Sequence, residues 1–186
     1  ADIVTVIDRS GSMGSSDARN NQTRIEAARQ AVNSLIEFTT TGTRLGVVAF
    51  SSGANVASEF GVVDDSTRQQ YQSDVNDLFS GGGTSIWSGL EQAYSILTST
   101  ASPSANQTII LLSDGQGDNP QRVSQVVTDI AAEGITVHTI GLGNQINRQQ
   151  LNSIADNTGG QALFSPTSRR LQRLYQQLST AAQNRT

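Results

Sequence analysis

The sequence of 186 residues contains no cysteine and no lysine, and these two absences remove several classes of functional site. Without cysteine there is no disulfide, no thiolate metal site and no cysteine nucleophile. All twelve basic residues are arginine, so the lysine of a Walker motif is missing, although residues 81–83 are three consecutive glycines. The net charge of −4 argues against a nucleic-acid partner, because phosphate binding requires a basic surface.

Long apolar runs are also missing from the sequence. The longest have the length of a strand, whereas a membrane-spanning helix needs about 20 apolar residues, so we expect no membrane span. The chain begins with Ala1, and we interpret residues 1–186 as a single domain cut from a longer protein. N-x-T triplets at Asn21, Asn106 and Asn184 favour an extracellular or cell-surface location. We expect the domain to be a monomer.

Short apolar runs rich in β-branched residues alternate with helical patterns along the chain. Parallel strands buried on both faces of a sheet are predicted at 3–7, 45–50, 108–112 and 135–140, with a short strand at 161–164. Residues 54–60 are expected to form a short antiparallel edge strand beside 45–50. Helices are predicted at 23–40, 66–79, 86–97, between Asn119 and Gly134, and near 147–157, and a last one carries Leu171, Leu174 and Leu178.

Two helix starts have recognisable signals. Asn119 followed by Pro120 is typical of an N-cap with proline at the first helical position, and Gly134 ends the same helix. Ser66 with Gln69 predicts a capping box for the helix at 66–79. Alternating strands and helices predict an α/β fold, with a doubly wound, mostly parallel six-stranded sheet that has helices on both faces.

Oxygen-bearing side chains stand where the predicted strands end. Asp8 leaves the first strand, Asp114 leaves the central strand beside it, and Thr84 follows the three glycines just before a helix. In doubly wound sheets, ligands bind beyond the carboxyl ends of the strands. We therefore expect Asp8, Ser10, Ser12, Thr84 and Asp114 to converge in one crevice.

A set of oxygen ligands without histidine or cysteine favours a hard cation. Mg²⁺ is the first choice, since it prefers six oxygens, and Mn²⁺ and Ca²⁺ are alternatives. The period-two spacing of Asp8, Ser10 and Ser12 predicts an extended turn that points three side chains the same way. If hydroxyl groups take inner positions, the ion stays electrophilic and seeks an anionic oxygen from outside.

These residues resemble the metal-ion-dependent adhesion site of von Willebrand factor type A domains. The resemblance rests on DRSGS at 8–12, Thr84 in GGGTS and Asp114 in LLSDG. The segments GGGTSIWSGL, GITVHTIGLG and TGGQALF are most similar to the A domains of calcium-activated chloride channel regulators and their bacterial relatives. The resemblance implies a Rossmann-like sheet and Mg²⁺-dependent binding of a protein partner through its Asp or Glu. It also implies that the Thr84 loop and the last helix shift on binding.

Two other function classes compete with this interpretation. Aspartyl-phosphate phosphatases also place an Asp at a strand end, but they need a second Asp where Ser10 stands and a lysine farther on. A hydroxyl-rich site without a lysine or histidine base has little machinery for hydrolysis, so we expect no enzyme activity. A purely structural domain is the remaining alternative, and chelation would not affect it.

Several single residues are interpreted as structural. Arg9 and Asp118 are predicted to be exposed, and Met13 to be buried beneath the metal turn. His138 is expected to be a packed residue of its strand, and Trp87 to pack against its helix.

Overall fold

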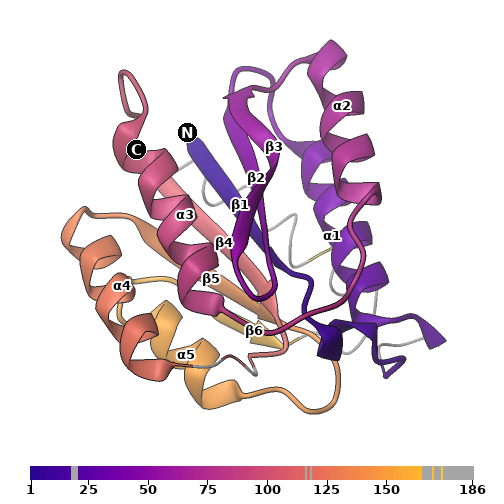
Figure 1. Cartoon of the computed structure of the whole chain (residues 1–186). Coiled ribbons are helices and arrows are strands. Elements are labelled where there is room, and N and C mark those ends of the chain that lie inside the picture. The colour runs from indigo at the N-terminus through magenta and orange to yellow at the C-terminus, as the bar shows by residue number, and fades with distance from the viewer. Residues whose placement is uncertain (18–20, 116, 118, 165–168, 170–172, 174–186) are drawn as a thin grey trace.

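The computed structural model of the chain describes residues 1–17, 21–115, 117, 119–164, 169 and 173 (Figure 1). Six strands form one sheet in the order β3-β2-β1-β4-β5-β6. The strands are β1 (Asp2–Asp8), β2 (Arg44–Phe50), β3 (Ala54–Val62), β4 (Gln107–Ser113), β5 (Thr136–Gly141) and β6 (Ala162–Phe164). Only the pairing of β2 with β3 is antiparallel. The predicted six-stranded, mostly parallel sheet is confirmed, although the edge strand β3 is nine residues long rather than short.

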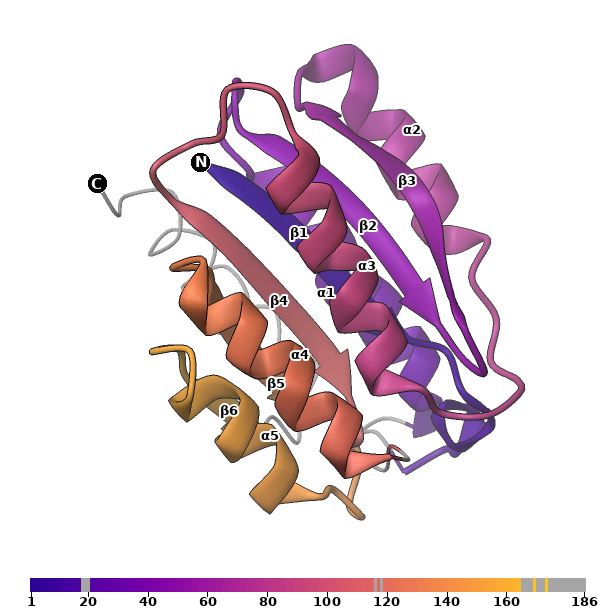
Figure 2. The same cartoon turned by 60° about the vertical axis from the view of Figure 1, so that its left-hand side comes forward.

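Helices cover both faces of the sheet (Figure 2). The helices are α1 (Arg24–Phe38), α2 (Asp65–Asn76), α3 (Ile86–Ser99), α4 (Pro120–Ala132) and α5 (Arg148–Asp156), with a 3-10 helix, η1 (Gly11–Gly14). In Figure 2, α3, α4 and α5 lie on the face turned to the viewer, and α1 lies behind the sheet. None of the described helices is long and apolar enough to cross a bilayer.

The core has two halves, one on each face of the sheet. Ile3 and Ile7 of β1 pack toward α1, whereas the intervening Val4 and Val6 pack toward α3. Successive side chains of a strand point to opposite faces, so a strand in the middle of the sheet needs apolar residues at every position. This requirement explains the continuous apolar runs from which the strands were predicted.

Most predicted helix starts are confirmed, and one is wrong. The Asn119 side chain accepts a hydrogen bond from the Arg122 N–H at 3.4 Å, with Pro120 at the first helical position. In α2, however, the N-cap is Asp64, whose carboxylate accepts from the N–H groups of Ser66 and Thr67, so the Ser66–Gln69 capping box does not form. The carboxylate is the better acceptor for these N–H groups because it is charged.

Two other predictions have different outcomes. Gly134, with φ +74°, ends α4 as predicted, since glycine adopts this left-handed conformation without steric cost. The leucines of the predicted last helix, Leu171, Leu174 and Leu178, lie outside the described residues.

Candidate metal centre

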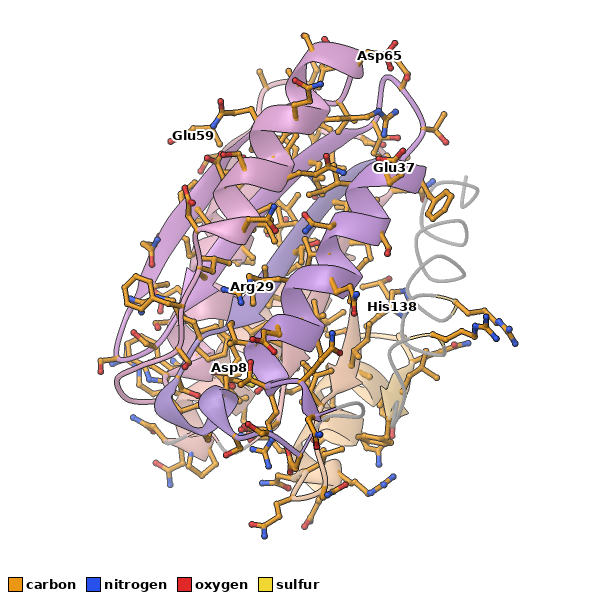
Figure 3. The ribbon with its side chains drawn as sticks, turned by 90° about the vertical axis from the view of Figure 1, so that its right-hand side faces the viewer. Asp8, Arg29, Glu37, Glu59, Asp65 and His138 are labelled. Carbon is orange, nitrogen blue, oxygen red and sulfur yellow. The ribbon has the colours of Figure 1, made fainter. Side chains whose placement is uncertain are left out.

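Two carboxylates meet at the carboxyl edge of the sheet. Asp8 is the last residue of β1, and Asp114 directly follows β4, the parallel neighbour of β1. Both residues are completely buried, at 0% exposure. Figure 3 places Asp8 at the end of the molecule where α1 begins, and Asp65 at the opposite end. The sheet topology therefore brings together two acids that are separated by more than half of the chain.

Serine hydroxyl groups connect the two acids. The Ser10 N–H donates to Asp8 Oδ1 at 2.9 Å, and Ser10 Oγ lies 3.1 Å from Ser12 Oγ. Ser12 Oγ in turn donates to Asp114 Oδ2 at 2.6 Å. Four of the five predicted ligands are therefore joined in one series of contacts, in which the Ser10 backbone N–H makes the link to Asp8 and hydroxyl groups make the others.

The chain does not stay extended through this turn, so that part of the prediction is wrong. From Gly11 to Gly14 it forms the 3-10 helix η1, closed by the Met13 N–H donating to the Ser10 carbonyl at 3.0 Å. The buried Met13 side chain, at 0% exposure, anchors η1 in the core, as predicted for this residue. The tight turn brings the Ser12 hydroxyl close to Ser10 and Asp114.

The loop that carries Thr84 lies against this turn. The Gly81 N–H donates to the Arg9 carbonyl at 2.8 Å, and the Gly11 N–H donates to the Gly82 carbonyl at 3.0 Å. Gly82 has φ +85°, a conformation that favours glycine. Thr84 itself is half-buried, and its hydroxyl makes no hydrogen bond to the four other predicted ligands in the described part of the chain. The loop that carries Thr84 therefore lies at the site, but the Thr84 hydroxyl is not joined to the other four predicted ligands among the described residues.

The buried acids make this edge strongly electronegative. The pKa of Asp8 is raised to about 6, mainly by burial and also by the nearby Asp114 charge, against the hydrogen bonds from Ser10 and Ser113, which lower it. Ser113 was not predicted as part of the site, yet its Oγ donates to Asp8 Oδ2 at 2.7 Å and accepts from the Gly115 N–H at 2.9 Å. A buried carboxylate with a raised pKa is one whose charge needs compensation, and a bound cation would supply it.

Arg24 is the second site residue that the sequence patterns did not indicate. This first residue of α1 is only 4% exposed, and its Nη1 donates to Asp114 Oδ2 at 2.9 Å. Its Nε and Nη2 donate to the two carboxylate oxygens of Asp17 at 2.7 and 2.6 Å. A positive charge in the first turn of a helix opposes the helix dipole, and that is the signal that could have pointed to a specific partner.

The donor set fits a hard cation. It consists of carboxylate and hydroxyl oxygens, the ligands that Mg²⁺, Mn²⁺ and Ca²⁺ prefer. The described residues contain no group of three or more His, Cys, Asp and Glu side chains that could hold a metal. An ion at this edge would therefore depend on serine and threonine oxygens as well as on the two acids.

Other singled-out residues have structural roles or lie outside the described part. His138 is a packed residue of β5, as predicted, and its Nδ1 accepts from the Gln161 N–H at 3.1 Å. Trp87 is half-buried in α3, and the Arg122 guanidinium lies 3.9 Å from the centre of its ring. Arg9 is only partly exposed and lies 5.5 Å from the centre of the Phe79 ring. Asp118 is not among the described residues.

The comparison with protein families identifies the domain. The family model described as "von Willebrand factor type A domain" matches residues 2–177. The chain belongs to this family. Domains of this type are typically adhesion or protein-interaction modules, and the mostly parallel sheet with surrounding helices agrees with their Rossmann-like fold.

Curated relatives of this von Willebrand factor type A domain include calcium-activated chloride channel regulators. Calcium-activated chloride channel regulator 1 of Bos taurus is 28% identical over 165 residues, which cover 88% of this chain and 17% of that protein. The Homo sapiens regulator 1 is 30% identical over 158 residues, covering 85% of this chain and 16% of that protein. The chain thus spans about one sixth of the length of these relatives.

Solved structures share the fold over nearly the whole domain. A von Willebrand factor type A protein from Catenulispora acidiphila has a TM-score of 0.86 at 26% identity, covering 97% of this chain and 42% of that chain. The conserved hypothetical protein BatB from Bacteroides thetaiotaomicron has a TM-score of 0.82 at 16% identity, with 99% of both chains covered.

Proposed function

We propose that this von Willebrand factor type A domain binds a protein partner through a divalent cation held at the carboxyl edge of its sheet. The observation that carries the proposal is the buried pair Asp8 and Asp114, joined through the hydroxyl group of Ser12 and by contact with Ser10. Ser10, Ser12 and Thr84 would supply neutral oxygens, and the two acids would bind directly or through water. Mg²⁺ is the proposed ion, with Mn²⁺ and Ca²⁺ as alternatives.

The bound partner group is proposed to be a carboxylate. The two carboxylates do no more than neutralise the doubly charged ion. The hydroxyl ligands are neutral, so they donate less negative charge to the ion than carboxylates would. When bound, the cation would supply an electrophilic position for one more anionic oxygen. An Asp or Glu side chain of the partner is the protein group that fits this position.

Hydrolysis is the less favoured function for the same site. The chain has no lysine, and its histidine, His138, is packed in β5 rather than placed at the site. The hydrogen bonds described for the two acids come from serines and from the permanently charged Arg24, and none of these side chains acts as a general base at neutral pH. We expect no Mg²⁺-dependent turnover of a phosphomonoester, and measurable phosphatase activity that Asp8→Asn abolishes would refute a pure binding role.

The proposal extends to the context of the domain. We propose that residues 1–186 are one domain of a longer protein that acts outside the cell or at its surface. The proposal of a longer protein is supported by the relatives, in which the matching segment is a small part of the whole chain.

The first experiment measures cation binding alone. Mn²⁺ is titrated into the purified, chelator-treated chain by calorimetry and by electron paramagnetic resonance, and one ion per chain is expected. Asp8→Asn and Asp114→Asn should each abolish this binding. Asp65→Asn is the matched control, because Asp65 is fully exposed at the start of α2, at the other end of the molecule (Figure 3). Equal Mn²⁺ affinity of the wild type and both site variants would refute the proposed site.

The second experiment tests the carboxylate. Water-proton relaxation is measured on the Mn²⁺-loaded chain while a short peptide with a single Glu is added, against the same peptide with Gln. The Glu peptide should displace water from the ion and lower the relaxation enhancement, whereas the Gln peptide should not. If both peptides have the same effect, the ion does not select a carboxylate.

A further inference from the structure

Arg24 occupies an unusual position for a positive charge. Its guanidinium is buried between two acids, with Asp114 on one side and Asp17 on the other. The contact with Asp114 lies within the proposed cation site, because Ser12 Oγ donates to the same Oδ2 atom that Arg24 contacts. A cation bound at this edge would therefore lie close to a permanent positive charge.

Asp17 is the group that balances this charge. The two carboxylate oxygens of Asp17 accept from Nε and Nη2 of Arg24 in a bidentate pair. One of them also accepts from the Asn144 N–H at 2.9 Å, so the acid is held from a second side by the loop after β5. The Arg24 hydrogen bond lowers the pKa of Asp17 to about 2, so the acid is ionised at neutral pH.

Gly143, in the loop after β5, lies directly against the ion pair of Arg24 and Asp17. Gly143 has φ +92°, and a Cβ atom there would lie 2.2 Å from Arg24 Nε and 2.8 Å from Asp17 Oδ1. The backbone therefore approaches the ion pair more closely than any residue with a side chain would permit. Burial of the Arg24 guanidinium reduces solvent screening, so its charge acts more strongly on the neighbouring groups.

We propose that Asp17 is a positioning residue of the cation site, whose negative charge offsets that of Arg24 and so sets the cation affinity without contact with the ion. With Asp17 in place, the connected set of Asp8, Asp114, Arg24 and Asp17 carries two net negative charges, and these match a divalent cation. Without the Asp17 charge, Arg24 would compensate one of the two site acids and oppose the ion. This inference rests on the proposed cation-binding function.

The test is a set of Mn²⁺ titrations by calorimetry on four variants. Asp17→Asn should weaken binding by about tenfold or more, because one unit of charge is removed near a doubly charged ion. Asp17→Glu keeps the charge and should stay within about threefold of wild type. The neutral pair Asp17→Asn with Arg24→Gln should also recover to within about threefold, since both charges are removed together. Asp65→Asn is the exposed control and should bind as wild type does.

These variants separate charge from fold. Unfolding of each one is followed by urea titration in chelator, so that affinity is compared only between folded chains. If Asp17→Asn does not fold, Arg24→Gln is compared with the neutral pair, because these two also differ only in the Asp17 charge. Arg24→Gln should then bind Mn²⁺ about tenfold more tightly than the neutral pair does.

The outcomes distinguish this inference from the function on which it rests. Wild-type affinity in Asp17→Asn would overturn the role of Asp17 and leave the cation site intact. A neutral pair as weak as Asp17→Asn would also overturn it, because the loss would then come from structure rather than from charge. A wild-type chain that binds no Mn²⁺ would overturn both proposals.

Discussion

Replacing Asp8 by Asn should make the cation-free domain more stable at neutral pH, although it removes a predicted metal ligand. Asp8 is completely buried, and its pKa is raised to about 6 by that burial. The folded chain therefore binds a proton at Asp8 more tightly than the unfolded chain does, and stability falls as the pH rises from about 4 to about 6. Asparagine has nearly the same shape and carries no charge to bury.

The size of the effect follows from the pKa difference. A shift of about 2 units between the unfolded and folded chains corresponds to about 3 kcal/mol of lost stability at pH 7. Asparagine would in turn lose the hydrogen bond from Ser113 Oγ, which costs about 1 kcal/mol. The net gain expected for Asp8→Asn in chelator is therefore about 2 kcal/mol at pH 7. Near pH 4, where Asp8 of the folded wild type is protonated, the charge penalty is largely gone and the lost hydrogen bond remains, so Asp8→Asn should be the slightly less stable chain, by up to about 1 kcal/mol.

The assay is urea unfolding of both chains in EDTA at pH 4, 5 and 7. In a parallel thermal unfolding measurement, 2 kcal/mol corresponds to a rise in Tm of roughly 4–8 °C for a domain of this length. The difference between the two chains isolates Asp8, because the other acids titrate in both. A difference that does not change with pH would refute the argument, since it would mean that the Asp8 charge is not costly in the absence of a cation. With saturating Mg²⁺, the order of stability should reverse.

Three further changes have defined outcomes. Mg²⁺ at a hundredfold excess over its Kd should stabilise the chain by about 2.7 kcal/mol, and identical Tm values with Mg²⁺ and with EDTA would contradict this. Gly89→Ala should lower the free energy of unfolding, measured by urea titration, by about 1–3 kcal/mol, because a Cβ there would lie 2.6 Å from Phe50 Cδ1 and 2.9 Å from Val6 Cγ1. Tyr71→Phe should cost about 1 kcal/mol at pH 7, since the hydroxyl donates to the Leu45 carbonyl at 2.7 Å. Burial raises the pKa of Tyr71 to about 12, so the wild type should lose stability between about pH 10 and pH 12 and the variant should not.

The sheet could be predicted from the sequence because each buried strand is a continuous apolar run. The placement of Asp8 and Asp114 followed from the same patterns, since both directly end such runs and parallel strands end at one edge. What sequence periodicity does not contain is the local path between elements. The 3-10 helix Gly11–Gly14 is set by a tertiary anchor, the buried Met13, and not by the alternation of polar residues.

The partners of Arg24 and Asp17 could not be predicted, because these contacts join distant positions without a repeating pattern. Arg24 contacts Asp114, 90 residues away in the sequence, and Asp17 contacts the loop after β5, 127 residues away. The position of the N-cap of α2 failed for a different reason. Asp64 and Ser66 are both good N-cap residues, and the choice between them depends on which side chain reaches the free N–H groups.

The two outer strands of the sheet have a consequence for the behaviour of the domain at high concentration. Edge strands with open hydrogen-bonding groups are templates on which another chain can add a strand. At one edge, the pairing of β3 with β2 has register shifts between Leu45 and Val47 and between Val47 and Val48, and the charged Glu59 projects from β3 (Figure 3). At the other edge, β6 offers only three residues. Neither edge is a long, flat and uncharged strand, so we expect the domain to resist strand-exchange aggregation and to sediment as a monomer at millimolar concentration.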